Sequence, residues 1–365
     1  MNYFSMLIKP ASSLCNMRCR YCFYYDVASH RETASYGIMA TDTVDCLLTK
    51  TFASVKSPAT VSFTFQGGEP TMAGLSFFTY FTEQAQKLVP SGIKLSYSIQ
   101  TNGMVIDENW CKLFVKHHFL VGLSLDGPRE IHDYQRLNSD RKGTYDQVHR
   151  TLKLFRKFGV DFNILSVITK QTAKKPQTLF QFYLKQDFKF VQLIPCLRPL
   201  DSDATAPHDL DPRSYAEFMK RFFLLWYDHL KKGHYVSVRQ FDNLVWMLRG
   251  RPAEQCGLMG FCTPQFVLES DGSVYPCDFY VLDEYKSGNI LTDDFEQIKN
   301  SPATRKFLEY HTETSPLCET CKVKSICGCG CKRYRPFYNE IKDYCPYQDF
   351  LYEAYPKLYE IAKTM

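Results

Sequence analysis

Three cysteines near the start of the chain have a spacing that could hold an iron–sulfur cluster. Cys15, Cys19 and Cys22 form a C-x3-C-x2-C pattern. Soft thiolates are preferred ligands of Fe–S clusters and of zinc. A structural zinc site and an ordinary electron-transfer [4Fe–4S] cluster each take four protein ligands. Three close cysteines without an evident fourth partner would leave one iron open to a small ligand, and a structural zinc knuckle is the alternative.

A glycine pair followed by a carboxylate is the second motif. Gln66-Gly-Gly-Glu-Pro70 comes directly after an alternating apolar run. Gly67 and Gly68 would let the backbone approach a ligand closely, and Glu69 supplies a carboxylate beside it. Taken alone, the motif is equally compatible with a simple turn between a strand and a helix.

Three further polar residues, Gln100, Ser124 and Arg136, could face a cavity. Gln100 and Ser124 stand at the ends of two apolar runs. Arg136 could bind a carboxylate through two parallel hydrogen bonds. Each of these residues, taken singly, is more often a solvated polar side chain.

The last third of the chain holds a second group of cysteines. Nine of the fifteen cysteines lie between Cys256 and Cys345. Their patterns are Cys318-x2-Cys321-x5-Cys327-x3-Cys331 followed by Cys345, and Cys262-x9-Gly272-x4-Cys277 preceded by Cys256. In a chain expected to be cytoplasmic, so many cysteines indicate metal or redox chemistry rather than disulfides. The sequence therefore predicts two metal-bearing modules, with a pair of zinc ribbons as the alternative for the second.

Alternating strands and helices must position the first group of cysteines, Cys15, Cys19 and Cys22. Apolar runs predict six strands, at residues 5–9, 61–65, 94–100, 120–124, 161–168 and 190–194. Helical patterns predict helices at 43–52, 74–89, 108–117, 144–158 and 175–186, then at 214–232, 241–248 and 347–362 after a polar loop at 200–212. This alternation indicates an α/β fold with a parallel sheet, in the form of an open (β/α)6 partial TIM barrel. In such barrels the chemistry lies at the carboxyl ends of the strands.

Charge and hydropathy argue against nucleic-acid and membrane partners. The net charge of +5 is spread along the chain with no block of like charge, so we expect no nucleic-acid partner. No run reaches the roughly 18 apolar residues of a membrane span, so we expect no membrane partner. The first ten residues show no signal-peptide pattern, and we expect a cytoplasmic protein.

The first motif closely resembles the signature of the radical S-adenosylmethionine (SAM) superfamily. The resemblance implies that Cys15, Cys19 and Cys22 ligate a [4Fe–4S] cluster whose open iron holds SAM. It implies SAM contacts from Gly67, Gly68 and Glu69, from Ser124, and from the segments around Arg136 and Leu197. Tyr24, Gln66 and Gln100 are expected to line the substrate cavity, although Tyr24 is as readily interpreted as a packed aromatic residue.

The second group of cysteines resembles the SPASM domain, an accessory module of peptide-modifying radical SAM enzymes. That domain carries two further clusters, so the resemblance implies three [4Fe–4S] clusters in all. By the same resemblance, Cys256, Cys262, Cys277 and Cys331 ligate one auxiliary cluster, and Cys318, Cys321, Cys327 and Cys345 ligate the other. Of the rest, Cys46, Cys111 and Cys196 are expected to be small buried hydrophobes. Cys329 lies between Cys327 and Cys331 and could replace a neighbour as ligand, although we expect that it does not. We expect domains at 1–235 (partial barrel), 236–345 (SPASM) and 346–365 (closing helix).

Short motifs along nearly the whole chain resemble the anaerobic sulfatase-maturating enzymes. They include Phe65-Gln-Gly-Gly-Glu-Pro70, Gln100-Thr-Asn-Gly103 and Glu269-Ser-Asp-Gly-Ser-Val-Tyr-Pro-Cys-Asp-Phe-Tyr280. The resemblance implies oxidation of a serine or cysteine in a sulfatase to Cα-formylglycine, begun when a 5′-deoxyadenosyl radical takes hydrogen from Cβ. Asp278, directly after Cys277, would be the base.

The resemblance also implies the partners of the reaction. These are an unfolded or nascent sulfatase segment as substrate and a reduced flavodoxin or ferredoxin as electron donor. Two other functions stay open from the sequence: a SPASM-type radical SAM maturase that forms thioether bonds in a peptide, and a non-catalytic Fe–S electron carrier or scaffold.

Overall fold

The chain forms two compact units, each assembled from separate stretches of sequence. The computed structural model describes residues 3–200, 206–310 and 312–364. The first unit comprises the described residues of Met1–Ser124, Asp133–Phe162 and Pro264–Glu309, and the second comprises those of Leu125–His132, Asn163–Thr263 and Tyr310–Met365. Part of the polar loop predicted at 200–212, residues 201–205, lies outside the described residues.

The first unit is built on a sheet whose central strands are parallel. Its strands are β1 Tyr3–Ile8, β2 Ala59–Phe65, β3 Ile93–Thr101, β4 Phe119–Ser124, β8 Phe266–Leu268, β9 Ser273–Tyr275 and β10 Gly288–Asn289. The order is β10-β9-β8-β1-β2-β3-β4. Strands β1 to β4 pair in parallel, and β8 also pairs in parallel with β1. Strands β8, β9 and β10 pair with one another in antiparallel fashion.

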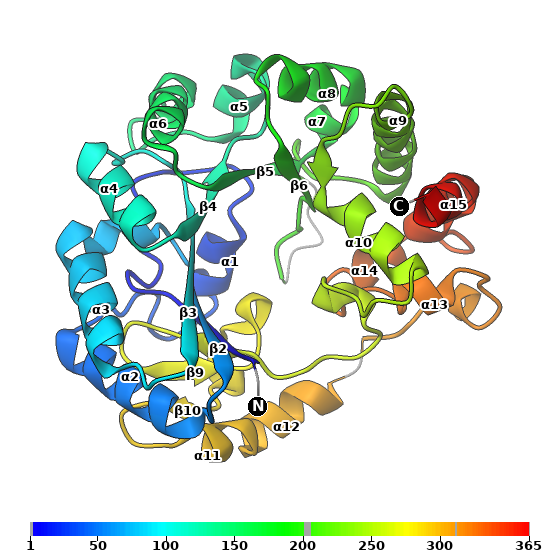
Figure 1. The fold of residues 1–365 in the computed structure, drawn as a ribbon. Coiled ribbons are helices and arrows are strands. Elements are labelled where there is room, and N and C mark those ends of the chain that lie inside the picture. Colours follow the sequence, from blue (N-terminus) through cyan, green and yellow to red (C-terminus); the bar gives the residue numbers. More distant parts are fainter. Residues whose placement is uncertain (1–2, 201–205, 311, 365) are drawn as a thin grey trace. The chain divides into compact units, whose positions relative to one another are not determined.

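Helices cover this sheet. They are α1 Phe23–Ser29, α2 Thr41–Ser54, η1 Pro70–Ala73, α3 Leu75–Leu88, α4 Glu108–Lys116, α6 Tyr145–Phe158, η3 Asp278–Tyr280, η4 Asp283–Tyr285, α11 Phe295–Lys299 and α12 Pro302–Glu309. Figure 1 shows α2, α3, α4 and α6 side by side in an arc outside β2, β3 and β4. The short helix α5 Arg129–Gln135 spans the point at which the chain passes between the units.

Aromatic side chains pack α3 and α4 onto the sheet. The ring of Phe65 on β2 lies 4.9 Å from that of Phe78 and 5.0 Å from that of Phe81, both on α3, measured between centroids. Phe78 also contacts Trp110 of α4 at 5.2 Å. Burial of each such ring removes much apolar surface from water, and edge-to-face pairs add a further increment. This packing fixes the strand ends that carry the polar motifs.

The second unit combines three parallel strands with a helical layer. Its strands are β5 Phe162–Ile168, β6 Phe190–Pro195 and β7 Ser237–Val238, in the order β5-β6-β7. Its helices are α7 Lys170–Ala173, α8 Pro176–Lys185, α9 Pro212–Lys231, α10 Arg239–Leu248, η2 Cys256–Leu258, η5 Pro316–Cys318, α13 Lys324–Cys327, α14 Arg335–Tyr338 and α15 Pro346–Thr364. The last helix packs on α9 and α10, where Phe350 lies 6.0 Å from both Phe223 and Phe241.

The six predicted strands and eight predicted helices all form. Each strand lies within two residues of its predicted bounds, since the apolar runs that predict them are the buried faces. The closing helix predicted at 347–362 is α15, and within this unit it covers α9 and α10. The module boundaries predicted at 235/236 and 345/346 stay predictions.

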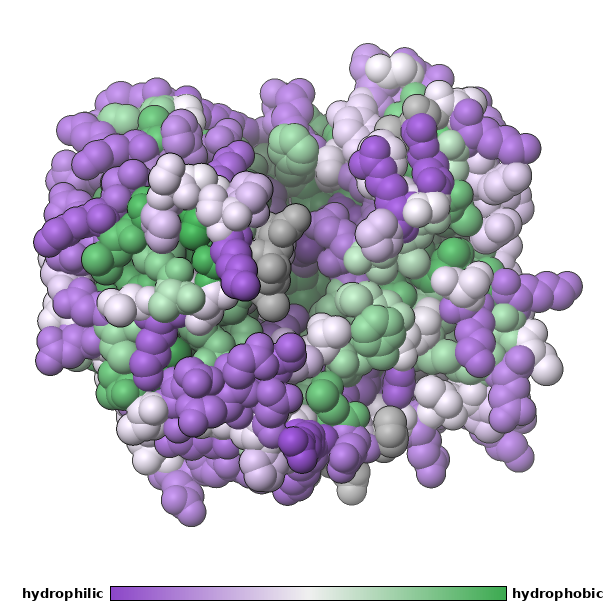
Figure 2. Space-filling model, turned by 60° about the horizontal axis from the view of Figure 1, so that its bottom comes forward, coloured by the Kyte–Doolittle hydropathy of each residue, from purple (hydrophilic) through white to green (hydrophobic). Residues whose placement is uncertain are grey.

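The sequence predicts no membrane-spanning segment, and the surface and the described helices bear on this prediction. Hydrophilic side chains cover much of the face drawn in Figure 2, with smaller hydrophobic areas between them. Within residues 3–200, 206–310 and 312–364, no helix is both long and apolar enough to cross a bilayer.

Candidate active site and cluster sites

The cysteine loop between β1 and α1 packs against the two glycines that follow β2. Gly68 donates its backbone N–H to Ser12 O at 2.9 Å, and Glu69 donates to Leu14 O at 2.8 Å. A Cβ on Gly68 would lie 2.3 Å from Leu14 O, and Gly67 has a φ of 121°. Because a side chain at either position would push the loop away, the glycine pair positions the cysteines.

Polar groups surround the thiols of this loop. The Sγ of Cys15 accepts from Met17 N at 3.4 Å and from Asn102 Nδ2 at 3.8 Å. Asn102 is itself held by Asn16, whose Oδ1 accepts from the same Nδ2 at 2.8 Å. Cys22 is the N-cap residue of α1, and its thiol lies near the backbone N–H groups of the first helical turn. Such donors stabilise negative charge on sulfur.

Burial of the thiols of this loop opposes negative charge on their sulfur atoms. It raises the pKa of Cys15 to about 11, with the nearby Glu69 carboxylate adding to the effect. Burial also raises the pKa of Cys22, against the backbone hydrogen bonds from Tyr25 and Tyr24. A cation at the thiols would reverse this balance, because metal binding deprotonates a coordinating thiol. Among the described residues no three His, Cys, Asp or Glu side chains converge as metal ligands, so the fit of a cluster rests on the soft donor set and its hydrogen bonds.

Glu69 ties the ends of β2 and β3 together. Its side chain is buried, and Oε1 accepts from Thr71 N, Thr71 Oγ1 and Thr101 Oγ1 at 3.1, 2.6 and 2.7 Å. Oε2 accepts from Asn102 N at 2.7 Å. Burial raises the pKa of Glu69, and these hydrogen bonds counteract the increase. One oxygen, Oε2, keeps acceptor capacity for a ligand.

Asp278 lies in a group of polar side chains from three segments of the first unit. The Lys9 Nζ lies 2.9 Å from Oδ1, and the Tyr24 hydroxyl donates to Oδ2 at 2.8 Å. The same hydroxyl lies 3.0 Å from Gln66 Oε1. Lys9 is buried and its ammonium also lies 4.6 Å from the centroid of the Tyr24 ring. Burial and the Asp278 carboxylate raise the pKa of Tyr24 well above its ordinary value, so the phenol stays a proton donor.

The other predicted cavity residues are distributed over both units. Gln100 is on β3 and Ser124 ends β4. Arg136 is buried, with its guanidinium 5.5 Å from the centroid of the Tyr21 ring. Leu197 belongs to the second unit, where its carbonyl accepts weakly from the Cys196 thiol.

Three of the four cysteines predicted for the first auxiliary cluster lie together in the second unit. Burial raises the pKa of Cys331, and the neighbouring thiols of Cys256 and Cys262 add to the rise. A Cβ on Gly257 would lie 3.2 Å from the Cβ of Cys331, so these two segments are in contact. The fourth cysteine, Cys277, precedes η3 in the first unit.

The cysteines predicted for the second auxiliary cluster line a cavity in the second unit. Its volume is about 20 Å³. Cys318, Cys327 and Cys345 line it together with Cys329. Cys321 is their neighbour, since it acts electrostatically on the pKa of both Cys327 and Cys345. The donor set, four cysteine thiols with Cys329 beside them, fits a cluster.

The cysteines outside the motifs behave mostly as predicted. Cys111 and Cys196 are buried, whereas Cys46 is half-buried and its thiol lies 3.3 Å from Ile290 O. The prediction was wrong for Cys46, because the Ile290 carbonyl, which also accepts from Lys50 Nζ at 2.6 Å, gives the thiol a polar partner.

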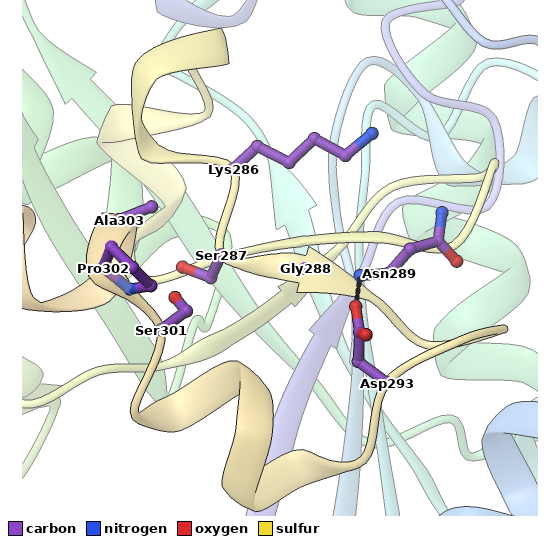
Figure 3. A pocket seen from close by; sticks show the side chains of 8 residues that line it. All are labelled: Lys286, Ser287, Gly288, Asn289, Asp293, Ser301, Pro302 and Ala303. Atoms are coloured by element: carbon purple, nitrogen blue, oxygen red, sulfur yellow. Dashed lines mark hydrogen bonds between the residues drawn. The ribbon is translucent and has the colours of Figure 1, made fainter.

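One open pocket in the first unit contains none of the predicted site residues. Figure 3 shows it between the β10 segment and the start of α12, lined by Ser287, Gly288, Asn289 and their neighbours. Its volume is about 450 Å³. Its carboxylate, Asp293, already accepts from Asn289 N at 2.8 Å.

Comparison with known proteins identifies the family. Residues 10–183 match the model of the radical SAM superfamily, and residues 261–322 match SPASM, an iron–sulfur cluster-binding domain. The chain is 41% identical to a cysteine-type anaerobic sulfatase-maturating enzyme of Clostridium novyi, over 100% of this chain and 99% of that protein. The chain belongs to the anaerobic sulfatase-maturating enzymes.

Other relatives and solved structures resemble this chain to different degrees. A serine-type anaerobic sulfatase-maturating enzyme of Bacteroides thetaiotaomicron is 26% identical over 95% of this chain and 90% of its own. The solved structure of native anSMEcpe with bound AdoMet and Kp18Cys peptide matches with a TM-score of 0.91 and 39% identity over 100% of both chains. Streptococcus suis SuiB bound to precursor peptide SuiA shares the fold, with a TM-score of 0.64 over 95% of this chain and 74% of its own at 16% identity.

Membership in the sulfatase-maturating family confirms the predicted fold class and enzyme class. The α/β fold is that of radical SAM enzymes with a SPASM domain, and the chain is a radical SAM enzyme. The cofactors of these two domains are AdoMet and several [4Fe–4S] clusters. The roles of the individual residues stay predictions.

The sequence interpretation missed two residues of the site. Lys9 stands in an apolar strand segment and gave no signal, although a lysine at the carboxyl end of a strand is a recognisable position for chemistry. Asn102 was interpreted only as the end of a strand, yet it bridges Glu69 and Cys15.

Proposed function

We propose that this chain oxidises a cysteine of a sulfatase polypeptide to Cα-formylglycine. The observation that carries the proposal is the full-length similarity to cysteine-type enzymes, at 41% identity against 26% for a serine-type enzyme. The carboxylate expected to act as base, Asp278, supports it, because buried Lys9 and Tyr24 hold it in one orientation.

The residues that would hold the reactive groups are those of the cysteine loop and the strand ends. Cys15, Cys19 and Cys22 would ligate the first cluster. The SAM contacts would come from Gly67, Gly68, Glu69, Ser124, Arg136 and Leu197. When bound, the reduced cluster and SAM supply the 5′-deoxyadenosyl radical that removes a hydrogen atom from the substrate Cβ.

Asp278 would accept the proton of the substrate thiol. Loss of that proton and of one electron from the carbon radical makes a thioaldehyde, which water converts to the aldehyde with release of hydrogen sulfide. Among the described residues, Oδ1 has the Lys9 ammonium at 2.9 Å and Oδ2 accepts from the Tyr24 hydroxyl at 2.8 Å. Each carboxylate oxygen has a second lone pair that could receive the thiol proton. The Lys9 ammonium balances the carboxylate charge before and during substrate binding. Gln66 and Gln100 would line the cavity beside Tyr24. Exclusion of water from such a cavity protects a radical from side reactions.

The auxiliary clusters would supply an acceptor for the electron that the substrate loses. Cys256, Cys262, Cys277 and Cys331 would ligate one of them, and Cys318, Cys321, Cys327 and Cys345 the other. A reduced flavodoxin or ferredoxin in the cytoplasm would supply the first electron, and the substrate would be an unfolded or nascent segment.

Anaerobic mass spectrometry of the reconstituted enzyme with SAM and reductant tests this function. Peptides carrying cysteine, serine or alanine at one position of a sulfatase motif are compared. We expect the cysteine peptide to exchange its sulfur for oxygen and lose two hydrogens, faster than the serine peptide loses two hydrogens. Conversion of the serine peptide alone would contradict the cysteine preference. Loss of two hydrogens with sulfur retained would indicate thioether formation, and no product with all clusters present would indicate a scaffold.

A further inference from the structure

Five cysteines, one more than a [4Fe–4S] cluster needs, gather at the second auxiliary site. Cys329 lines the same cavity as Cys318, Cys327 and Cys345. Its backbone N–H donates to the Cys327 Sγ at 3.3 Å. Cys318 and Cys329 are electrostatic neighbours in this cavity lining. The side chain of Cys329 therefore faces the donor set from inside the cavity.

The backbone at Cys329 is held in a conformation that disfavours a side chain. Gly328, Cys329 and Gly330 have φ values of 56°, 62° and 71°, so three successive residues are left-handed. The two glycines are required by close packing, since a Cβ would lie 2.5 Å from Gly260 N in one case and 2.5 Å from Tyr338 Cε2 in the other. A non-glycine residue in this region is strained, because its Cβ comes close to the following carbonyl oxygen. Strain of this kind is a reason to look for a function of the side chain.

We propose that Cys329 is a reserve ligand of the second auxiliary cluster and can take the place of Cys318. This inference rests on the cluster content of the proposed function, but not on peptide oxidation. Cys318 is the ligand to be replaced, because it lines the same cavity as Cys329, whereas Cys327 is already tied to Cys329 through the backbone N–H of Cys329. Cys318 also ends the short helix η5, outside the α13 turn that carries Cys327.

A reserve thiolate would protect the cluster. When the bond between iron and Cys318 opens, the iron would find a second thiolate already in place, and it would be retained instead of released. The exchange changes no oxidation state, since one thiolate replaces another and the proton passes to the thiol that leaves.

Iron content of the anaerobically reconstituted full chain tests the exchange. Wild type and Cys318→Ala should both hold about twelve irons, four for each of three [4Fe–4S] clusters. The matched variant Cys321→Ala and the double variant Cys318→Ala/Cys329→Ala should hold about eight irons each by the same count. The electron paramagnetic resonance signal of the second auxiliary cluster should persist in Cys318→Ala with shifted g values. Loss of one cluster from Cys318→Ala, as from Cys321→Ala, would overturn the proposal.

If Cys318→Ala fails to fold, the rate of iron release from proteins that keep Cys318 tests the proposal instead. Glycine relieves the left-handed strain, so Cys329→Gly should unfold at no lower temperature than wild type. It should nevertheless lose four irons to an anaerobic chelator several-fold faster, whereas Cys46→Ala, which removes a thiol outside the cluster motifs, should match wild type. Equal release from Cys329→Gly and wild type would contradict a ligand role. These experiments measure iron and not peptide oxidation. If the iron contents and release rates are as expected but the enzyme does not oxidise the peptide, only the proposed reaction is contradicted.

Discussion

The ammonium of Lys9, at the end of the first strand, lies 2.9 Å from a carboxylate oxygen of Asp278, which begins a turn after β9. Lys9 is 3% exposed and Asp278 is 15% exposed, so the ion pair is largely withdrawn from water. Pairing a buried carboxylate in this way fixes its position and its charge. The proposed base is thus held by the strand that leads into the cysteine loop.

Removal of the ammonium should therefore damage both stability and reaction. Lys9→Met keeps the apolar length of the side chain but leaves Asp278 without its cation. Breaking a buried pair costs on the order of 3 kcal/mol, so we expect a drop of that size in the free energy of unfolding, measured by denaturant under anaerobic conditions. The exposed pair of Lys157 and Glu108 offers a matched control. Lys157→Met should change stability by less than about 1 kcal/mol, and equal losses in the two variants would contradict the assignment.

Close packing at Gly68 predicts a variant that loses the first cluster but keeps the other two. Gly68→Ala would place a Cβ 2.3 Å from Leu14 O and 2.6 Å from Ser13 O, both backbone atoms of the cysteine loop. We expect the loop to move and reconstituted protein to bind about four irons fewer, one [4Fe–4S] cluster. At Gly37, where no atom lies within 4 Å of a built Cβ, alanine should cost stability through its positive φ but keep the full iron content. Full iron content in Gly68→Ala would show that the loop tolerates the side chain.

His117 predicts a pH dependence of stability. Burial lowers its pKa from the ordinary value of 6.5, and Nε2 is buried without a hydrogen-bond partner among the described residues. Because the folded-state pKa is lower, the unfolded chain takes up the proton first as pH falls. The contribution to stability is therefore fully present above about pH 6.5 and is lost as pH falls towards the folded-state pKa.

Replacement of this imidazole should remove that contribution. Between about pH 7.5 and pH 5.5, the free energy of unfolding should fall less in His117→Gln than in wild type. Replacement of the exposed His234 by Gln should keep the wild-type dependence. Parallel pH profiles for His117→Gln and wild type would contradict the prediction.

The sequence predicted the first unit's parallel strands well because their signals are local. Val61, Phe63 and Phe65 alternate with less buried residues, and all three are fully buried in β2. Polar groups that follow such runs, such as Glu69 and Ser124, lie at the carboxyl ends of the strands as expected. The cysteine motifs were readable for the same reason, since ligand spacing is a local property.

Other features depend on contacts between distant segments and could not be predicted. The strands β8, β9 and β10 are two or three residues long, too short for a periodic signal, yet they extend the sheet beside β1. The ion pair of Lys9 with Asp278 exists only because β8 places that later segment next to β1. The left-handed backbone at Cys329 likewise follows from tertiary packing around its glycines. From the sequence alone, replacement of a neighbouring ligand by this cysteine was considered but not expected.

The most direct test of the central claim compares two products in one reaction. Wild type and Asp278→Asn are incubated anaerobically with SAM, reductant and the cysteine peptide, and 5′-deoxyadenosine and oxidised peptide are quantified together. Loss of a general base reduces a rate about 10²-fold or more, so we predict that Asp278→Asn still forms 5′-deoxyadenosine while oxidised peptide falls about a hundredfold. An unchanged ratio of oxidised peptide to 5′-deoxyadenosine in Asp278→Asn would contradict the account.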